Sequence, residues 1–197
     1  MDDVIMRAGP VFWFASRAFG IVAYVALTLE VLLGLGASTG HFDRVLGRGR
    51  VTELHRWLSA IVLATVAMHA IVLLGDKTVD FSLVDLLVPF RGPYRQVAVG
   101  LGILGGYALL TLHVSHALRK RIGQGAWRRL HYVSFAAFVL ASLHGILAGS
   151  DASKLGLKTL YVGAALLVTG LTFLRLFQVV VARRAQSGTA IGSAVRR

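Results

Sequence analysis

The stretch LHRWLSAIVLATVAMH, residues 54–69, is an apolar run that carries a histidine close to each end, His55 and His69. An ionisable side chain in a segment apolar enough to cross a membrane is costly, and such residues mark functional sites by default. The two histidines are 14 residues apart. A helix rises about 1.5 Å per residue, so roughly 20 Å separates them along the helix axis. The segment therefore presents two imidazoles at two depths of a bilayer.

A second apolar run repeats the arrangement. The stretch LHYVSFAAFVLASLH, residues 130–144, places His131 and His144 13 residues apart. Two helices with such pairs can hold two flat ligands at two depths, and haem with bis-imidazole iron takes one histidine on each face. A step of 14 residues leaves a helix about 40° short of whole turns, whereas a step of 13 leaves about 140°. The second helix therefore needs a tilt, a kink or a bulge near Gly145 to aim both histidines at one face.

The composition is typical of a polytopic membrane protein. Of the 197 residues, 56% are hydrophobic, and the mean hydropathy is +0.70. The 21 lysines and arginines outnumber the 9 aspartates and glutamates. They gather at the ends of apolar runs, which is a signal of membrane topology, and we expect no nucleic-acid partner. Cysteine is absent, which excludes thiolate-ligated haem and cysteine-held iron–sulfur clusters.

Five apolar segments are long enough to cross a lipid bilayer. They cover residues 11–35, 54–74, 96–118, 127–147 and 157–181. We predict an all-α, polytopic bundle of five transmembrane helices. Residues 1–182 form a di-haem transmembrane domain in this interpretation, and residues 183–197 form a basic, flexible cytoplasmic tail.

The basic residues predict the orientation of the bundle. They concentrate in the first and third connections between segments and in the tail, whereas the other two connections are mixed in charge. By the positive-inside rule the C-terminus is cytoplasmic and the N-terminus is outside. His55 and His131 adjoin basic connections, and His69 and His144 lie toward the outer side. Topology therefore sorts the histidines into the same two pairs as their spacing does.

These segments resemble the ferric reductase-like transmembrane domain, which NADPH oxidases, ferric reductases and the haem subunit of the periplasmic methionine sulfoxide reductase system share. The resemblance implies a stand-alone bacterial member in the cytoplasmic membrane with two b-type haems. His55 and His131 would hold the inner haem, and His69 and His144 the outer one. The resemblance rests on FWFASRAFGIVAY at 12–24, the stretch at 54–69, VDLLVPFRGPYR at 84–95 and GAWRRLHYVSFAAFVLASLHG at 125–145.

Several cations are candidates for binding haem propionates. Arg17 resembles the family's arginine that faces the outer haem, with Arg91, Tyr94 and Arg95 closing the same end. The alternative for Arg17 is snorkelling to the outer interface. The inner ligands are flanked by Arg56, Arg128 and Arg129, whose presence the topology signal alone also explains.

Two other features lie near the expected haems. His113 and His116, three residues apart, are a weak metal signal, and we expect solvated or propionate-facing roles for them. The amphipathic stretch from Asp80 to Phe90 is expected to lie along the outer surface and to shield the outer haem.

The function that follows is electron transfer across the membrane, with no catalytic residue assigned. Saturated iron favours outer-sphere electron transfer. The sequence has no Gly-rich phosphate loop and no flavin- or nicotinamide-binding domain, so we expect a separate flavin or quinol donor, and an acceptor protein or small oxidant outside. Two alternatives stay open. One is a haem-free structural or ion-conducting subunit, and the other is a cytochrome b561-like quinol or ascorbate oxidoreductase.

Overall fold

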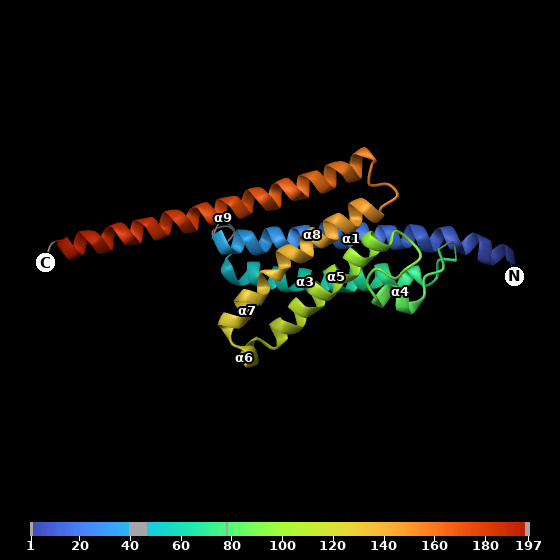
Figure 1. Cartoon of the computed structure of the whole chain (residues 1–197), viewed down its shortest axis with the longest axis horizontal. Coiled ribbons are helices and arrows are strands. Elements are labelled where there is room, and N and C mark those ends of the chain that lie inside the picture. The colour runs from blue at the N-terminus through green and yellow to red at the C-terminus, as the bar shows by residue number, and fades with distance from the viewer. Residues whose placement is uncertain (1, 40–46, 78, 196–197) are drawn as a thin grey trace.

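The computed structural model describes residues 2–39, 47–77 and 79–195, which contain helices and no strand (Figure 1). Apolar helices suit a bilayer because each satisfies its own backbone hydrogen bonds. In chain order the helices are α1 (Asp2–Thr39), α3 (Arg48–Leu73), α4 (Leu83–Leu87), α5 (Gln96–Ala117), α6 (Arg119–Ile122), α7 (Gln124–His131), α8 (Val133–Ala148) and α9 (Leu155–Val195).

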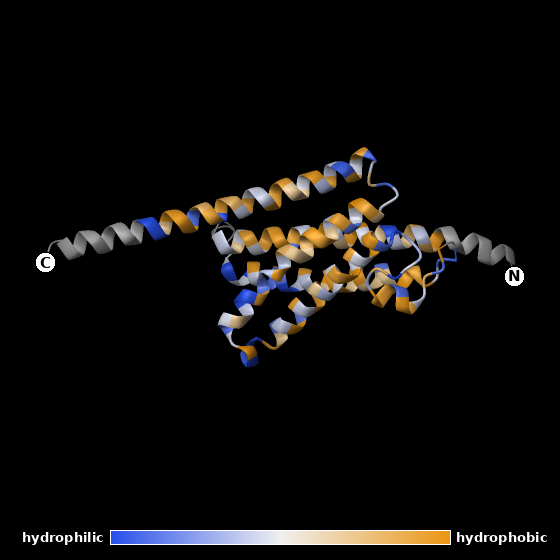
Figure 2. Cartoon of the chain, viewed as in Figure 1, coloured by the Kyte–Doolittle hydropathy of each residue, from blue (hydrophilic) through white to orange (hydrophobic). Residues whose placement is uncertain are grey.

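The expectation of five membrane-crossing helices is confirmed. Apolar residues cover the long helices, and polar ones gather in the connections and in α6 and α7 (Figure 2). Among the described residues, the five spans are Val11–Thr39, Arg48–Leu73, Gln96–Ala117, Gln124–Ala148 and Leu155–Arg184.

Helix α1 lies at the centre of the bundle. It packs against α3, α8 and α9, whereas α5 packs chiefly against α8. Tyr24 of α1 is 5% exposed and joins three helices. Its ring stacks on Phe138 of α8 at 5.9 Å between centroids and contacts Tyr161 of α9 at 4.8 Å. Its hydroxyl hydrogen-bonds Ser142 at 3.0 Å, so one residue fixes α8 and α9 against α1.

The fourth span is broken at Tyr132, next to His131. The amide of Tyr132 bonds the carbonyl of Arg129, and the amide of Phe135 bonds the carbonyl of Tyr132, both at 3.2 Å. These three-residue steps are 3₁₀ geometry, which winds about 120° per residue instead of about 100°. The extra rotation acts in the direction that the 13-residue histidine step requires. Gly145 lies inside the regular helix α8, so the expected irregularity near Gly145 was wrong in its position.

Helix α9 is the longest element and extends beyond one end of the bundle (Figure 1). It continues to Val195. The predicted boundary at residue 182 therefore falls inside a helix. The flexibility of the tail stays a prediction.

Candidate functional site

The four histidines of the two apolar runs form two facing pairs. His69 of α3 faces His144 of α8, with ring centroids 5.9 Å apart and ring planes at 78°. His55 of α3 faces His131 at the end of α7, at 6.1 Å and 69°. All four side chains are half-buried. The structure therefore brings together the same pairs that the spacing and the topology predict.

Three of the histidines are oriented by main-chain carbonyls. The Nδ1–H of His69 donates to the carbonyl of Ser16 at 2.7 Å, and the Nδ1 of His144 bonds that of Ala98 at 2.8 Å. The Nδ1 of His55 bonds the carbonyl of Glu30 at 3.1 Å. A ring that donates from Nδ1 keeps the lone pair of Nε2 for a metal, and metal-bound histidines usually have such a second partner.

A glycine follows each of these carbonyl residues by four positions. Residues four apart share a helix face, so a side chain there would enter the space of the ring. A methyl group at Gly102 would lie 2.6 Å from His144 Nδ1, and one at Gly20 would lie 3.0 Å from His69 Nδ1. At Gly34 the corresponding distance to His55 Cε1 is 3.4 Å. We call each carbonyl with its glycine a histidine socket: Ser16/Gly20, Glu30/Gly34 and Ala98/Gly102.

The sockets of α1 match the spacing of α3. Ser16 and Glu30 are 14 residues apart, as are Gly20 and Gly34, and as are His55 and His69. Because α1 and α3 pack side by side in opposite directions, both histidines of α3 meet α1 at equivalent positions.

His131 is held differently, by aromatic packing. Its ring lies 5.2 Å from that of Trp127, with planes at 33°. Trp127 also contacts His116, with ring centroids 5.8 Å apart. Arg119 Nη1 donates to His116 Nε2 at 3.0 Å. The indole Nε1–H of Trp127 is buried and has no hydrogen-bond acceptor among the described residues.

An apolar cavity adjoins the His69–His144 pair. Its walls come from α1, α3, α5, α8 and α9, and include Leu27, Val66 and Ala141. Arg17 lines the same cavity, and its Nη2 forms an ion pair with Asp151 Oδ2. Lys154 Nζ lies 3.1 Å from the other carboxylate oxygen of Asp151. Arg17 therefore lies in the same cavity as His69 and His144 and is held there by the carboxylate of Asp151.

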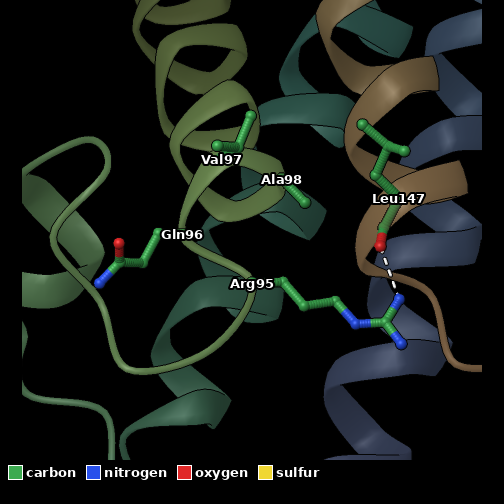
Figure 3. A pocket seen from close by; sticks show the side chains of 5 residues that line it. All are labelled: Arg95, Gln96, Val97, Ala98 and Leu147. Carbon is green, nitrogen blue, oxygen red and sulfur yellow. Dashed lines mark hydrogen bonds between the residues drawn. The ribbon is translucent and has the colours of Figure 1, made fainter.

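Residues before α5 secure this end of the bundle. Arg95, the N-cap of α5, donates from Nη1 to the carbonyl of Leu147 at 2.6 Å (Figure 3). The hydroxyl of Tyr94 donates to the carbonyl of Ala148 at 3.2 Å. Both bonds tie the end of α8 to the start of α5, close to the socket at Ala98. They keep His144 in register with its socket.

The amphipathic stretch before α5 packs against the same end. Phe81 is 5% exposed and lines the cavity, and Phe90 contacts α5 at Gly100. Helix α4 follows a capping box in which the hydroxyl and the amide of Ser82 bond the Asp85 carboxylate. These bonds hold the pKa of Asp85 below its usual range.

The remaining predicted cations and histidines are largely exposed. The Arg56 side chain is 65% exposed and pairs with Glu53 at 3.8 Å. Arg128, Arg129 and His113 are also exposed. Sequence reasoning did not assign site roles to Ser16, Glu30, Ala98, Trp127 or Asp151. Glu30 gave a usable signal, because a carboxylate inside an apolar span is rare.

The two histidine pairs fit bis-imidazole haem. A metal held by one nitrogen of each ring at about 2.1 Å places the ring centres roughly 6 Å apart, which is the separation in both pairs. The cavity beside His69 and His144 is mainly apolar, as the porphyrin ring requires, and Arg17 in its lining offers a cation for a propionate. Within the described residues no group of three or more histidine, cysteine or acidic side chains is arranged to hold a bare metal ion.

Comparison with protein families assigns the chain to a family of membrane proteins. A model of the family described as ferric reductase like transmembrane component matches residues 19–142. The chain belongs to this family. Ferric reductase-like domains are membrane electron-transfer components and generally bind haem. The matched range holds His55, His69 and His131, and His144 lies two residues past its end. Neither the curated proteins nor the solved structures give a match.

Proposed function

We propose that this protein is a di-haem cytochrome b that carries electrons across a membrane. The observation that carries the proposal is the pair of facing histidines repeated at two depths. Along α3 the two pairs are separated by 14 residues, or about 20 Å, a separation that supports one site near each side of a bilayer. His55 and His131 would hold one b-type haem, and His69 and His144 the other.

The chain's own residues would orient these ligands and shield them from water. A b-type haem with two imidazole ligands supplies one-electron transfer at saturated iron. The carbonyls of Ser16, Glu30 and Ala98 fix ring orientation and raise the basicity of the ligating nitrogen. The apolar cavity walls exclude water from the His69–His144 site. Arg17, held by Asp151, offers a guanidinium to a propionate.

The charge distribution favours one direction of transfer. The cationic helices α6 and α7 adjoin the His55–His131 pair, which supports a cytoplasmic location for that end. Electrons would enter there from a flavin protein, or from a quinol in the membrane. They would leave near His69 and His144 to an acceptor protein or small oxidant outside, and the host membrane is then the bacterial cytoplasmic membrane.

Single ligand variants test the pairing by depth. His69→Ala and His144→Ala should each remove the same haem and leave the other with its redox midpoint unchanged. His55→Ala and His131→Ala should each remove the other haem. Haem content by pyridine haemochrome and potentiometric titration measures both effects. If His55→Ala and His69→Ala depleted one and the same haem, the pairing would be wrong, and protein that binds no haem would refute the proposal.

A further inference from the structure

The indole N–H of Trp127 is a buried hydrogen-bond donor without an acceptor among the described residues. A buried indole nitrogen normally has a partner, because an unsatisfied buried donor costs about 1–3 kcal/mol. Such a donor therefore points to an acceptor that the protein chain does not supply.

The surroundings of Trp127 define the charge of that acceptor. The indole ring lies 5.2 Å from the ring of His131 and 5.8 Å from that of His116, measured between centroids. Arg119 adds a guanidinium beside His116, and Arg56 and His55 lie close enough to act electrostatically on His116. The buried indole N–H and the positive charges of Arg119 and Arg56 favour an anion with oxygen acceptors.

The position of Trp127 beside the His55–His131 pair indicates which anion it binds. Trp127 and His131 are four residues apart on α7, so they share one face of that helix. Trp127 packs directly on the ring of His131, which faces His55. Arg119, Arg128 and Arg129 are all exposed, and Arg119 is joined by a hydrogen bond to His116, which contacts Trp127.

We propose that Trp127, together with Arg119 oriented by His116, binds a carboxylate of the haem that His55 and His131 hold. This inference rests on the proposed function, since it requires haem at that pair. The indole N–H donates one hydrogen bond, and the Arg119 guanidinium supplies charge. The same chemistry would suit a lipid phosphate, and the experiment below separates the two sources.

The test follows the indole N–H of the full-length protein by ¹⁵N-edited NMR in nanodiscs. The chain has three tryptophans, and Trp127→Phe assigns the resonance of interest. Trp57→Phe is the matched control, because Trp57 is 60% exposed on α3. The protein is loaded with protohaem or with protohaem dimethyl ester, which lacks the free carboxylates, and is reduced so that low-spin iron is diamagnetic. The Soret band and the α-band report loading in each sample.

The proposal predicts that the Trp127 N–H lies further downfield with protohaem than with the dimethyl ester, although both bind. The haem ring current acts equally in both samples, whereas a carboxylate is a stronger acceptor than an ester carbonyl. The proposal also predicts that Trp127→Phe lowers affinity for protohaem about tenfold and leaves affinity for the ester unchanged. The same position of the Trp127 N–H resonance with the two porphyrins would overturn it. If the Trp127 N–H of the haem-free protein lay downfield in phosphatidylglycerol nanodiscs and lost that shift in a maltoside detergent, which has no phosphate, the acceptor would be lipid phosphate and the proposal would be overturned. Absence of haem binding altogether would overturn the proposed function, which the spectra reveal separately.

Discussion

Gly102→Ala should weaken one haem site while leaving the helix itself intact. The added methyl group would lie 2.6 Å from His144 Nδ1 and 2.8 Å from Cγ. Because Cγ is the root of the ring, the side chain cannot avoid the contact by moving only its tip. An ordinary contact begins at 3.4 Å, so the ring must move by about 0.8 Å. That movement disturbs the 2.8 Å bond between His144 Nδ1 and the carbonyl of Ala98.

The expected loss of haem affinity follows from the hydrogen bond that His144 loses to the carbonyl of Ala98. Removing the second hydrogen bond of a metal-bound histidine typically lowers metal affinity by about 10- to 100-fold, or about 1.4–2.7 kcal/mol. Alanine is better than glycine in a helix by about 1 kcal/mol, which offsets part of the cost of about 1–3 kcal/mol that an overpacked contact adds, so the haem-free protein should lose little stability. The variant should therefore separate haem affinity from folding.

The assay is a graded series of three glycine variants. Haem content and the two redox midpoints are compared with the thermal stability of the haem-free protein. Gly102→Ala should lose most of the His69–His144 haem, and Gly20→Ala, where the methyl lies 3.0 Å from His69 Nδ1, should lose less. Gly106→Ala is the control, since its methyl would meet only Val66 at 4.0 Å. Equal losses in all three variants, or full haem with unchanged midpoints in Gly102→Ala, would refute the reasoning.

Three further predictions follow from the charges. Reporter fusions after Arg121 and at the C-terminus should be cytoplasmic, and a fusion near Asp151 should be outside; the opposite pattern would exchange the inner and outer labels. Asp151→Asn should raise the midpoint of the His69–His144 haem alone, because Arg17 loses its anionic partner and an uncompensated cation favours the reduced state; a redox titration that finds both midpoints moved equally contradicts this. Glu30→Gln should retain the His55–His131 haem, because His55 is bonded by the main-chain carbonyl of Glu30; loss of that haem by pyridine haemochrome would show that the carboxylate itself is needed.

Much of the fold was predictable because membrane spans are long and uniform. The apolar runs gave the ends of the five membrane spans to within six residues, although α9 continues well past the predicted end of its segment. The pairing of His69 with His144 and of His55 with His131 followed from depth alone. Depth is readable from sequence because the rise per residue of a helix is constant.

The details of the site depended on packing between helices, which spacing within one segment does not encode. The sockets appear only when α1 is placed against α3, and α5 against α8. The sequence predicted an irregularity in the fourth span but not its position at Tyr132. A local change of helix geometry at any residue between His131 and His144 could have supplied the extra rotation. The pairing of Arg17 with Asp151 joins residues that are 134 positions apart in the sequence.

Haem stoichiometry of the purified protein tests the central claim most directly. The haem-to-protein ratio is measured by pyridine haemochrome against quantitative amino-acid analysis, on protein produced with haem in excess. The two facing histidine pairs predict two low-spin b haems per chain, with the reduced α-band of bis-imidazole ligation. One haem per chain, or none, in folded and fully loaded protein would contradict the account.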